Sequence, residues 1–210
     1  MTTDRKTHWE HIYLKRSDDQ LSWYEVRPQH SLELVRVAVS RGARSLIDIG
    51  GGTSRLVDAV LNEGLDRIAV MDVSETALAK TRDRLGARAD EIELILADVT
   101  TIDTVGRFDV WHDRAVFHFL ISAQDRTRYR ELAARTIPVG GYAIIATFGP
   151  EGPERCSGFP VHRYDERGLQ DELGDGFALV QSFAVNHRTP AGAEQQFVYA
   201  MLARVEGRDG

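Results

Sequence analysis

The strongest constraint on the fold is an alternation of short apolar runs with segments of helical periodicity, which begins after Gly42. The runs that we predict to be strands are "SLIDIG", "RIAVMDV", "IELILADV", "FDVWHD" and "GGYAIIATF". The helices predicted between and after them cover residues 53–63, 75–85, 123–136 and 165–173. Strands that are joined by crossovers of this length form a parallel sheet with helices on both faces.

The pattern changes after Gly176. Two long runs, residues 177–189 and 194–205, are separated only by "PAGA", and this gap is too short for a parallel crossover. They predict an antiparallel β-hairpin at the end of the sheet. The expected fold class is therefore α/β: a Rossmann-like, doubly wound, seven-stranded sheet that is mostly parallel and ends in a C-terminal hairpin.

A chain of 210 residues is long enough to bury one substantial core, so we predict a single domain, 1–210. Helical spacing at residues 4–16 and 29–41 indicates an N-terminal helical segment that caps the rest. The predicted parts are a lid or cap at 1–41, a Rossmann-like core at 42–205 and a frayed tail at 206–210.

Composition and missing sequence patterns argue against several classes of protein. The formal net charge of -6 argues against a nucleic-acid partner. No apolar run is long enough to span a membrane, and the first residues lack the apolar centre of a signal peptide, so the expected location is the cytoplasm. Cys156 is the sole cysteine, and the histidines have no close ligand spacing, so neither a disulfide nor a metal site is expected.

Three glycines, Gly50, Gly51 and Gly52, follow the first predicted strand, where open α/β sheets bind ligands. The plain alternative is a tight turn without a ligand. A phosphate-binding P-loop needs Lys-Ser/Thr after its last glycine, and this chain has "GTSRL" instead. The dinucleotide fingerprint needs another glycine where Arg55 stands, which disfavours an NAD-dependent oxidoreductase. A nucleoside without a pyrophosphate remains.

Aspartates stand at three successive strand ends: Asp48, Asp72 and Asp98. Asp72 follows the glycines by about 20 residues, where a carboxylate accepts hydrogen bonds from both ribose hydroxyls. Asp98 is placed to accept from an adenine amine, with Val73 and Val99 as apolar walls for the ring. Each aspartate alone is as compatible with a helix cap or a turn. The three together favour a nucleoside site.

These motifs resemble those of the class I S-adenosylmethionine-dependent methyltransferases, from the acidic residue and glycines of "DIGGG" to "LADV" and the terminal hairpin. The resemblance implies S-adenosyl-L-methionine as cofactor and S-adenosyl-L-homocysteine as product. It also implies the cofactor contacts. Asp48 would lie near the methionine amino group, and Gly50 to Gly52 under the methionine and ribose. Asp72 would bind the ribose, and Asp98 the adenine.

The segment "FDVWHDRAVFHFL" is similar to a W-D-R type segment of thiopurine-methyltransferase-like enzymes, with His112 as an insertion before Asp113 and Arg114. His112 is assigned to the cofactor site. Arg114 is a candidate clamp for an anionic substrate and His118 a candidate base, with Asp113 beside them. Pairing of Arg114 with a carboxylate and a hydrogen-bonded structural role for His118 are equally open.

Trp23 and Tyr24 are predicted to form part of the lid and to contact the substrate, while Trp9 and Tyr13 are expected to pack. Arg155 lies in a loop that we expect at the pocket mouth. The expected function is methyl transfer to O, N or S of a small molecule. The alternatives are a protein lysine methyltransferase, an NAD-dependent oxidoreductase and a non-catalytic nucleoside-binding protein.

Overall fold

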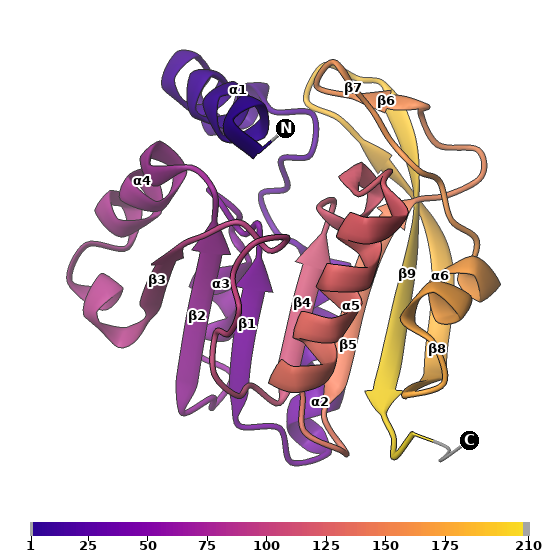
Figure 1. The fold of residues 1–210 in the computed structure, drawn as a ribbon. Helices are drawn as coiled ribbons and strands as arrows, with labels where there is room; N and C mark the ends of the chain where they lie inside the picture. The colour runs from indigo at the N-terminus through magenta and orange to yellow at the C-terminus, as the bar shows by residue number, and fades with distance from the viewer. Residues whose placement is uncertain (1, 208–210) are drawn as a thin grey trace.

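The computed structural model describes residues 2–207 as a twisted central sheet with helices on both faces (Figure 1). Its seven strands have the order β3-β2-β1-β4-β5-β9-β8. The parallel strands are β1 (Ser45–Ile49), β2 (Arg67–Asp72), β3 (Glu93–Leu96), β4 (Val110–Arg114) and β5 (Tyr142–Phe148). The antiparallel strands are β8 (Phe177–Arg188) and β9 (Glu194–Arg204), and β9 lies between β5 and β8. The predicted fold class is confirmed.

Helices precede the sheet and stand between most of its strands along the chain. They are α1 (Thr2–Lys15), α2 (Gln29–Ser40), α3 (Leu56–Val60), α4 (Glu75–Leu85), α5 (Ala123–Thr136) and α6 (Glu166–Leu173). Side-chain oxygens of Ser74, Ser122 and Asp165 accept hydrogen bonds from backbone N–H groups in the first turns of α4, α5 and α6. These caps fix the starts of three helices close to the predicted residues.

Two predicted elements are shorter than expected. The helix expected at 53–63 is reduced to the five residues of α3, because turns occupy the residues on both sides of it. The strand expected at 92–99 ends at Leu96. The Asp98 carboxylate accepts from the backbone N–H of Thr100, which bends the chain away from the sheet.

A small hairpin in the loop after β5 was not predicted. It consists of β6 (Arg155–Cys156) and β7 (Phe159–Pro160), which pair antiparallel through a turn where Ser157 has a φ of 49°. Strands of two residues leave no periodic pattern in a sequence. The Phe159 ring packs edge-on against His8 of α1, so this hairpin lies beside the N-terminal helix.

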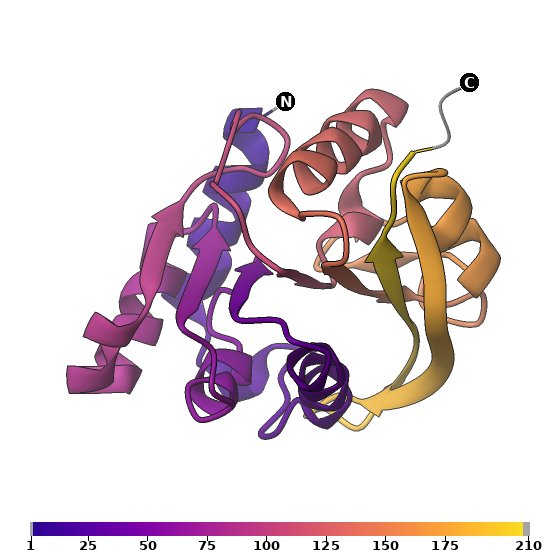
Figure 2. The ribbon, with the colours of Figure 1, turned by 90° about the horizontal axis from the view of Figure 1, so that it is seen from below.

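Alternation along the strands sends neighbouring side chains to opposite faces of the sheet. Ile47 and Trp111 belong to the core under α5 and α6, whereas Leu46 and Val110 belong to the core under α2 and α3. Figure 2 shows the sheet between these two layers. The same alternation decides on which side each polar residue at the strand ends lies.

Helix α1 lies across the carboxyl ends of the parallel strands (Figure 1). The Glu10 carboxylate accepts from backbone N–H groups at the start of α4, and Arg5 pairs with Asp125 of α5 at 2.6 Å. These contacts hold α1 on two sides of the sheet.

The division into a lid at 1–41 and a core at 42–205 remains a prediction, and the tail at 206–210 lies largely outside the described residues. None of the described helices is long and apolar enough to cross a membrane.

Leu202 tests the packing of β9 inside the sheet, because its side chain is fully buried in the core under α5 and α6. We expect Leu202→Ala to lower the free energy of unfolding by about 2–5 kcal/mol through lost burial and a residual cavity. Urea denaturation measures the change. Leu14→Ala is the matched control, since Leu14 is 71% exposed. Equal losses in the two variants would contradict the placement of β9.

Candidate functional site

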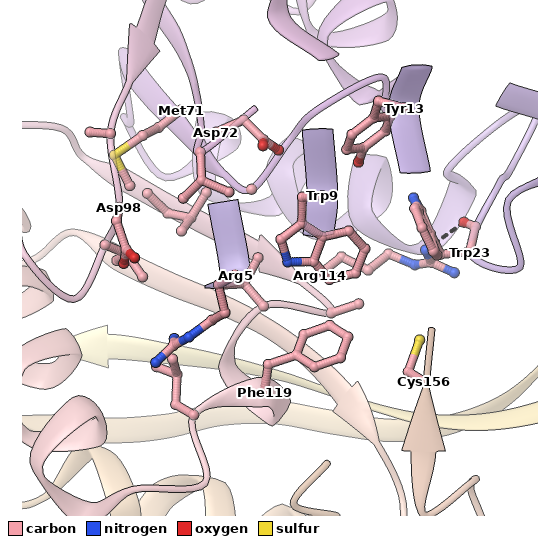
Figure 3. Close-up of a pocket in the computed structure, with 18 residues that line it drawn as sticks. Arg5, Trp9, Tyr13, Trp23, Met71, Asp72, Asp98, Arg114, Phe119 and Cys156 are labelled. Carbon is pink, nitrogen blue, oxygen red and sulfur yellow. Dashed lines mark hydrogen bonds between the residues drawn. The ribbon is translucent and has the colours of Figure 1, made fainter. Parts of the chain in front are cut away.

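A cavity of about 100 Å³ lies beneath α1 at the carboxyl ends of the parallel strands. One end is lined by residues of β2 and of the loops that follow β2 and β3 (Figure 3): Met71, Asp72, Val73, Ala97, Asp98 and Val99. The other end is lined by Trp9, Trp23, Phe119 and Cys156 (Figure 3). Predicted nucleoside contacts therefore share one end of the cavity, and aromatic side chains form much of the other.

Asp72 is buried, and its Oδ1 accepts from the Ser74 N–H at 2.8 Å. Burial raises the pKa of the Asp72 carboxyl to about 7, although the N–H groups of Ser74 and Val73 oppose this shift. The other oxygen, Oδ2, lies beside Gly52. A Cβ at Gly52 would come within 2.5 Å of the Tyr13 hydroxyl and 3.0 Å of Oδ2, and the residue has a φ of +47°. Glycine therefore lets three elements converge on this carboxylate.

Asp98 presents a second carboxylate to the same end of the cavity. Its Oδ1 is occupied, because it accepts from the N–H and the hydroxyl of Thr100 at 2.8 and 2.6 Å. These bonds fix the side chain's orientation. Val73 and Val99 line the cavity beside it, as predicted for the walls around a ring.

A second, smaller cavity lies on the α2 side of the glycine loop and shares Gly50, Trp23 and Arg114 with the first. Asp48 also lines it, and the Oδ2 of this buried carboxylate has no hydrogen-bond partner. Arg114 forms an ion pair with Glu25, whose Oε1 lies 3.3 Å from Nη2, so the structure shows the alternative in which Arg114 pairs with a carboxylate. Nη2 itself makes no hydrogen bond. A carboxylate oxygen and a guanidinium nitrogen that both lack hydrogen bonds therefore line one cavity.

The predicted group around β4 does not form one cluster. His112 and Arg114 lie on the α2 side of the sheet, whereas Asp113 points to the α5 side. Asp113 is fully buried. It accepts from the Tyr129 hydroxyl at 2.7 Å and from the N–H groups of Val116 and Phe117. Burial raises the pKa of Asp113 to about 6. Its contacts favour a structural role, in which it holds the turn after β4, over the predicted part in chemistry.

His118 is also fully enclosed and lines neither cavity. Its Nδ1 accepts from the Phe148 N–H at 3.3 Å. Burial lowers the pKa of His118 to about 3, and the nearby charge of Arg114 acts in the same direction. An imidazole that remains neutral inside the core cannot exchange a proton with a ligand in the cavity. This enclosure favours the hydrogen-bonded structural alternative over a base.

Of the predicted substrate and lid residues, Trp23 lines both cavities and Tyr24 lines the second. Arg155 is exposed, lines neither cavity, and donates to the Gly158 carbonyl within its own hairpin. This bond turns it away from the predicted place at the mouth. Cys156 does line the first cavity, and burial raises the pKa of its thiol, which favours an inert neutral form.

Trp9 and Tyr13 were expected only to pack, but both also line the first cavity. Their i, i+4 spacing on α1 was the available signal, because it places both rings on one side of the helix. Phe119 also lines this cavity but was not predicted, and its ring packs edge-on against that of Trp9, with the ring centres 5.3 Å apart (Figure 3). Among the residues that the structure describes, no group of histidine, cysteine and carboxylate side chains is arranged to hold a metal ion.

Residues 46–141 match the protein family described as a methyltransferase domain. A eukaryotic elongation factor 1A lysine and N-terminal methyltransferase of Danio rerio is 23% identical over 97% of the chain, which spans 30% of that relative. An uncharacterised methyltransferase of Mycobacterium tuberculosis is 34% identical over 41% of the chain, which corresponds to 36% of that relative. The chain thus spans only about a third of the length of these curated relatives.

Solved structures show the same fold. The N-methyltransferase NodS of Bradyrhizobium japonicum, in complex with S-adenosyl-L-homocysteine, has a TM-score of 0.74 at 18% identity and covers 96% of this chain and 99% of its own. A 1,6-didemethyltoxoflavin N1-methyltransferase of Burkholderia thailandensis has a TM-score of 0.69 at 18% identity and covers 98% of this chain and 86% of its own. The family match over residues 46–141 and the shared fold are both those of methyltransferases, and they support the resemblance of this chain to the class I S-adenosylmethionine-dependent enzymes.

The two cavities provide a chemical match for S-adenosylmethionine, the cofactor of this class. Asp72 can accept from ribose hydroxyls, and Val73 and Val99 form walls for an adenine. Asp48 Oδ2 and Arg114 Nη2 have the charges that an ammonium and a carboxylate require. The residues present therefore fit a nucleoside at one end and an amino-acid head at the other.

The raised pKa of Asp72 predicts pH-dependent cofactor binding. Ribose hydroxyls donate to the ionised carboxylate, and below about pH 7 this group is increasingly protonated in the free protein. Affinity for S-adenosyl-L-homocysteine should therefore rise with pH through this range and be up to about tenfold weaker at pH 6 than at pH 8. Calorimetric titration measures it. Asp72→Asn should bind weakly and lose the pH dependence; an unchanged pH profile in that variant would contradict the assignment.

Proposed function

We propose that the protein transfers the methyl group of S-adenosylmethionine to an O, N or S atom of a small-molecule acceptor. The cofactor would lie with its nucleoside at Asp72 and Asp98 and its methionine moiety between Asp48 and Arg114. It supplies an electrophilic methyl group when bound. The glycine loop of Gly50 to Gly52, Asp48, Asp72, Val73, Asp98 and Val99 would hold it, as proposed from the sequence. His112, which the sequence analysis also assigns to the cofactor site, has both ring nitrogens engaged inside the protein.

The main observation in support of a small-molecule acceptor is the position of α1 over the cavity. Its Trp9 and Tyr13 side chains form part of the cavity wall, and its Arg5 is anchored to α5 through Asp125. A cavity closed in this way excludes water and orders a small acceptor against the methyl group. A protein side chain would have to enter past this helix.

Positioning rather than proton transfer would supply most of the acceleration. Among the described residues, no histidine lines the first cavity, and the Cys156 thiol there has a raised pKa. Arg114, which lines both cavities, is our candidate for orienting the reacting groups. The enclosed Asp113 and His118 would instead support the turn and the wall behind it.

A protein lysine acceptor is the second candidate, because a relative that matches 97% of this chain over 30% of its own length is a lysine and N-terminal methyltransferase. Two experiments separate the candidates. Purified chain and methyl-labelled S-adenosylmethionine are incubated with a panel of small O, N and S nucleophiles, and separately with a lysate whose proteins are then analysed by mass spectrometry. Label in a small product supports the proposal, whereas label confined to protein lysines supports the alternative. Failure to bind S-adenosyl-L-homocysteine would contradict both.

Phe119 tests where the acceptor binds. Because its ring lines the cavity beside Trp9 and away from Asp72 (Figure 3), Phe119→Ala should raise the KM of an acceptor from the panel by about tenfold, the scale of one buried aromatic contact. The Kd of S-adenosyl-L-homocysteine should change less than twofold. Ile121→Ala is the control, since Ile121 is 55% exposed. Equal effects of Phe119→Ala on both ligands would contradict this location.

A further inference from the structure

A buried chain of polar side chains connects Asp48 of β1 to Ser31 of α2 through His112 of β4. His112 Nδ1 lies 2.6 Å from Asp48 Oδ1, and Nε2 lies 2.8 Å from Ser31 Oγ. The exposed fractions are 3% for Asp48, 2% for His112 and 0% for Ser31. Both ring nitrogens of His112 are thus used inside the protein, which leaves neither for a ligand.

The chain also fixes where the hydrogen atoms are. A carboxylate oxygen only accepts, so His112 Nδ1 must carry the hydrogen that it donates to Asp48. In the neutral ring Nε2 then accepts from the Ser31 hydroxyl. Asp48 and His112 are direct partners in the β1–β4 register, so the backbone itself places the two side chains next to each other. This pair leaves only one Asp48 oxygen, Oδ2, without a partner.

Asp48 Oδ2 lies against the glycine loop. A Cβ at Gly51 would come within 2.6 Å of this oxygen, so only glycine allows the loop to approach so closely. A buried carboxylate oxygen without a donor is costly, and a cationic ligand group in the adjoining cavity would remove that cost. The orphaned oxygen therefore points to a hydrogen-bond donor on the ligand, and an ammonium would in addition balance the charge of the carboxylate.

Arg114 supplies the opposite charge in the same cavity, and it is also held by the protein. Its Nε donates to the Tyr199 hydroxyl at 2.9 Å and Nη1 to the Trp23 carbonyl at 2.8 Å. Its side chain is 10% exposed, and Nη2 is the atom left without a hydrogen bond. Glu25, 3.3 Å from Nη2, partly balances the charge.

We propose that His112 is a positioning residue, which together with Ser31 holds Asp48 Oδ2 toward the ammonium of the methionine moiety, while Arg114 Nη2 binds its carboxylate. This inference rests on the proposed function, because it concerns the same cofactor. It assigns His112 no contact with the ligand. The site then selects the intact amino-acid head by two fixed charges that are set before the ligand arrives.

Three nucleosides test the proposal by calorimetric titration. S-adenosyl-L-homocysteine carries the whole head, S-adenosyl-3-thiopropylamine lacks the carboxylate, and 5′-methylthioadenosine lacks both charged groups. We expect the wild-type protein to bind the first at least a hundredfold more tightly than the third. His112→Ala should weaken S-adenosyl-L-homocysteine and the amine at least tenfold and 5′-methylthioadenosine less than twofold. Arg114→Gln should weaken S-adenosyl-L-homocysteine but not the amine.

Matched variants separate positioning from general damage to the fold. His112→Asn retains a donor toward Asp48 and should restore much of the lost affinity, and Ser31→Ala should cause a smaller, ammonium-dependent loss. His11→Ala, at an exposed histidine, should change nothing. Equal weakening of all three nucleosides by both His112→Ala and Ser31→Ala would overturn the proposal. So would equal affinity of the wild-type protein for the three. If none of the three nucleosides binds, the result would instead contradict the proposed function.

Discussion

Period-two alternation along β4 is the constraint on which the site depends. Successive residues of this strand, His112 and Asp113, enter opposite layers of the molecule. One joins the polar chain on the α2 side, and the other accepts hydrogen bonds under α5. The backbone turn that Asp113 holds begins directly after Arg114, where Ala115 has a φ of 75°. The end of β4 thus carries Arg114, which lines the cavities, on one face of the sheet and Asp113, which supports the following turn, on the other.

The glycine loop is the second feature on which the site depends. Gly51 and Gly52 allow two carboxylates, Asp48 and Asp72, to approach the backbone more closely than any side chain would permit. The carboxylates lie on neighbouring strands, and each has one oxygen occupied by the protein. A ligand with donors at a fixed separation therefore meets acceptors whose directions are already set. Such preorganisation reduces the ordering cost of binding.

Much of the fold could be predicted from the sequence, because the strand–helix alternation and the short "PAGA" gap each admit few topologies. That Asp72, Val73, Asp98 and Val99 line one cavity could also be predicted, since they lie at the ends of strands that meet at one edge of the sheet. The position of His112 between Asp48 and Ser31 could not be predicted. It depends on β1 and β4 being neighbours in register, and strand order is not encoded in local periodicity. The sequence analysis places His112, Asp113 and Arg114 side by side, although the alternation of side chains along a strand sends Asp113 to the opposite face of the sheet.

The cavity wall contributed by α1 was only partly predictable for a similar reason. The aromatic spacing of Trp9 and Tyr13 identifies one side of a helix but not what that side covers. Contacts of α1 with α4 and α5 decide this, and they depend on Glu10 and Arg5 finding partners far along the chain. Hairpin β6–β7, which packs on the same helix, is too short to be recognised from any pattern.

The closure by α1 has a thermodynamic consequence. The cavity has a volume of about 100 Å³, less than the roughly 300–1,000 Å³ of typical small-molecule sites, so α1 in this position leaves little room for a nucleoside. An outward displacement of α1 would break the contacts of Glu10 and Arg5, and the observed affinity would then be the intrinsic affinity reduced by the population of the open form. In that case two contacts remote from the reacting atoms would contribute to how readily the cofactor binds.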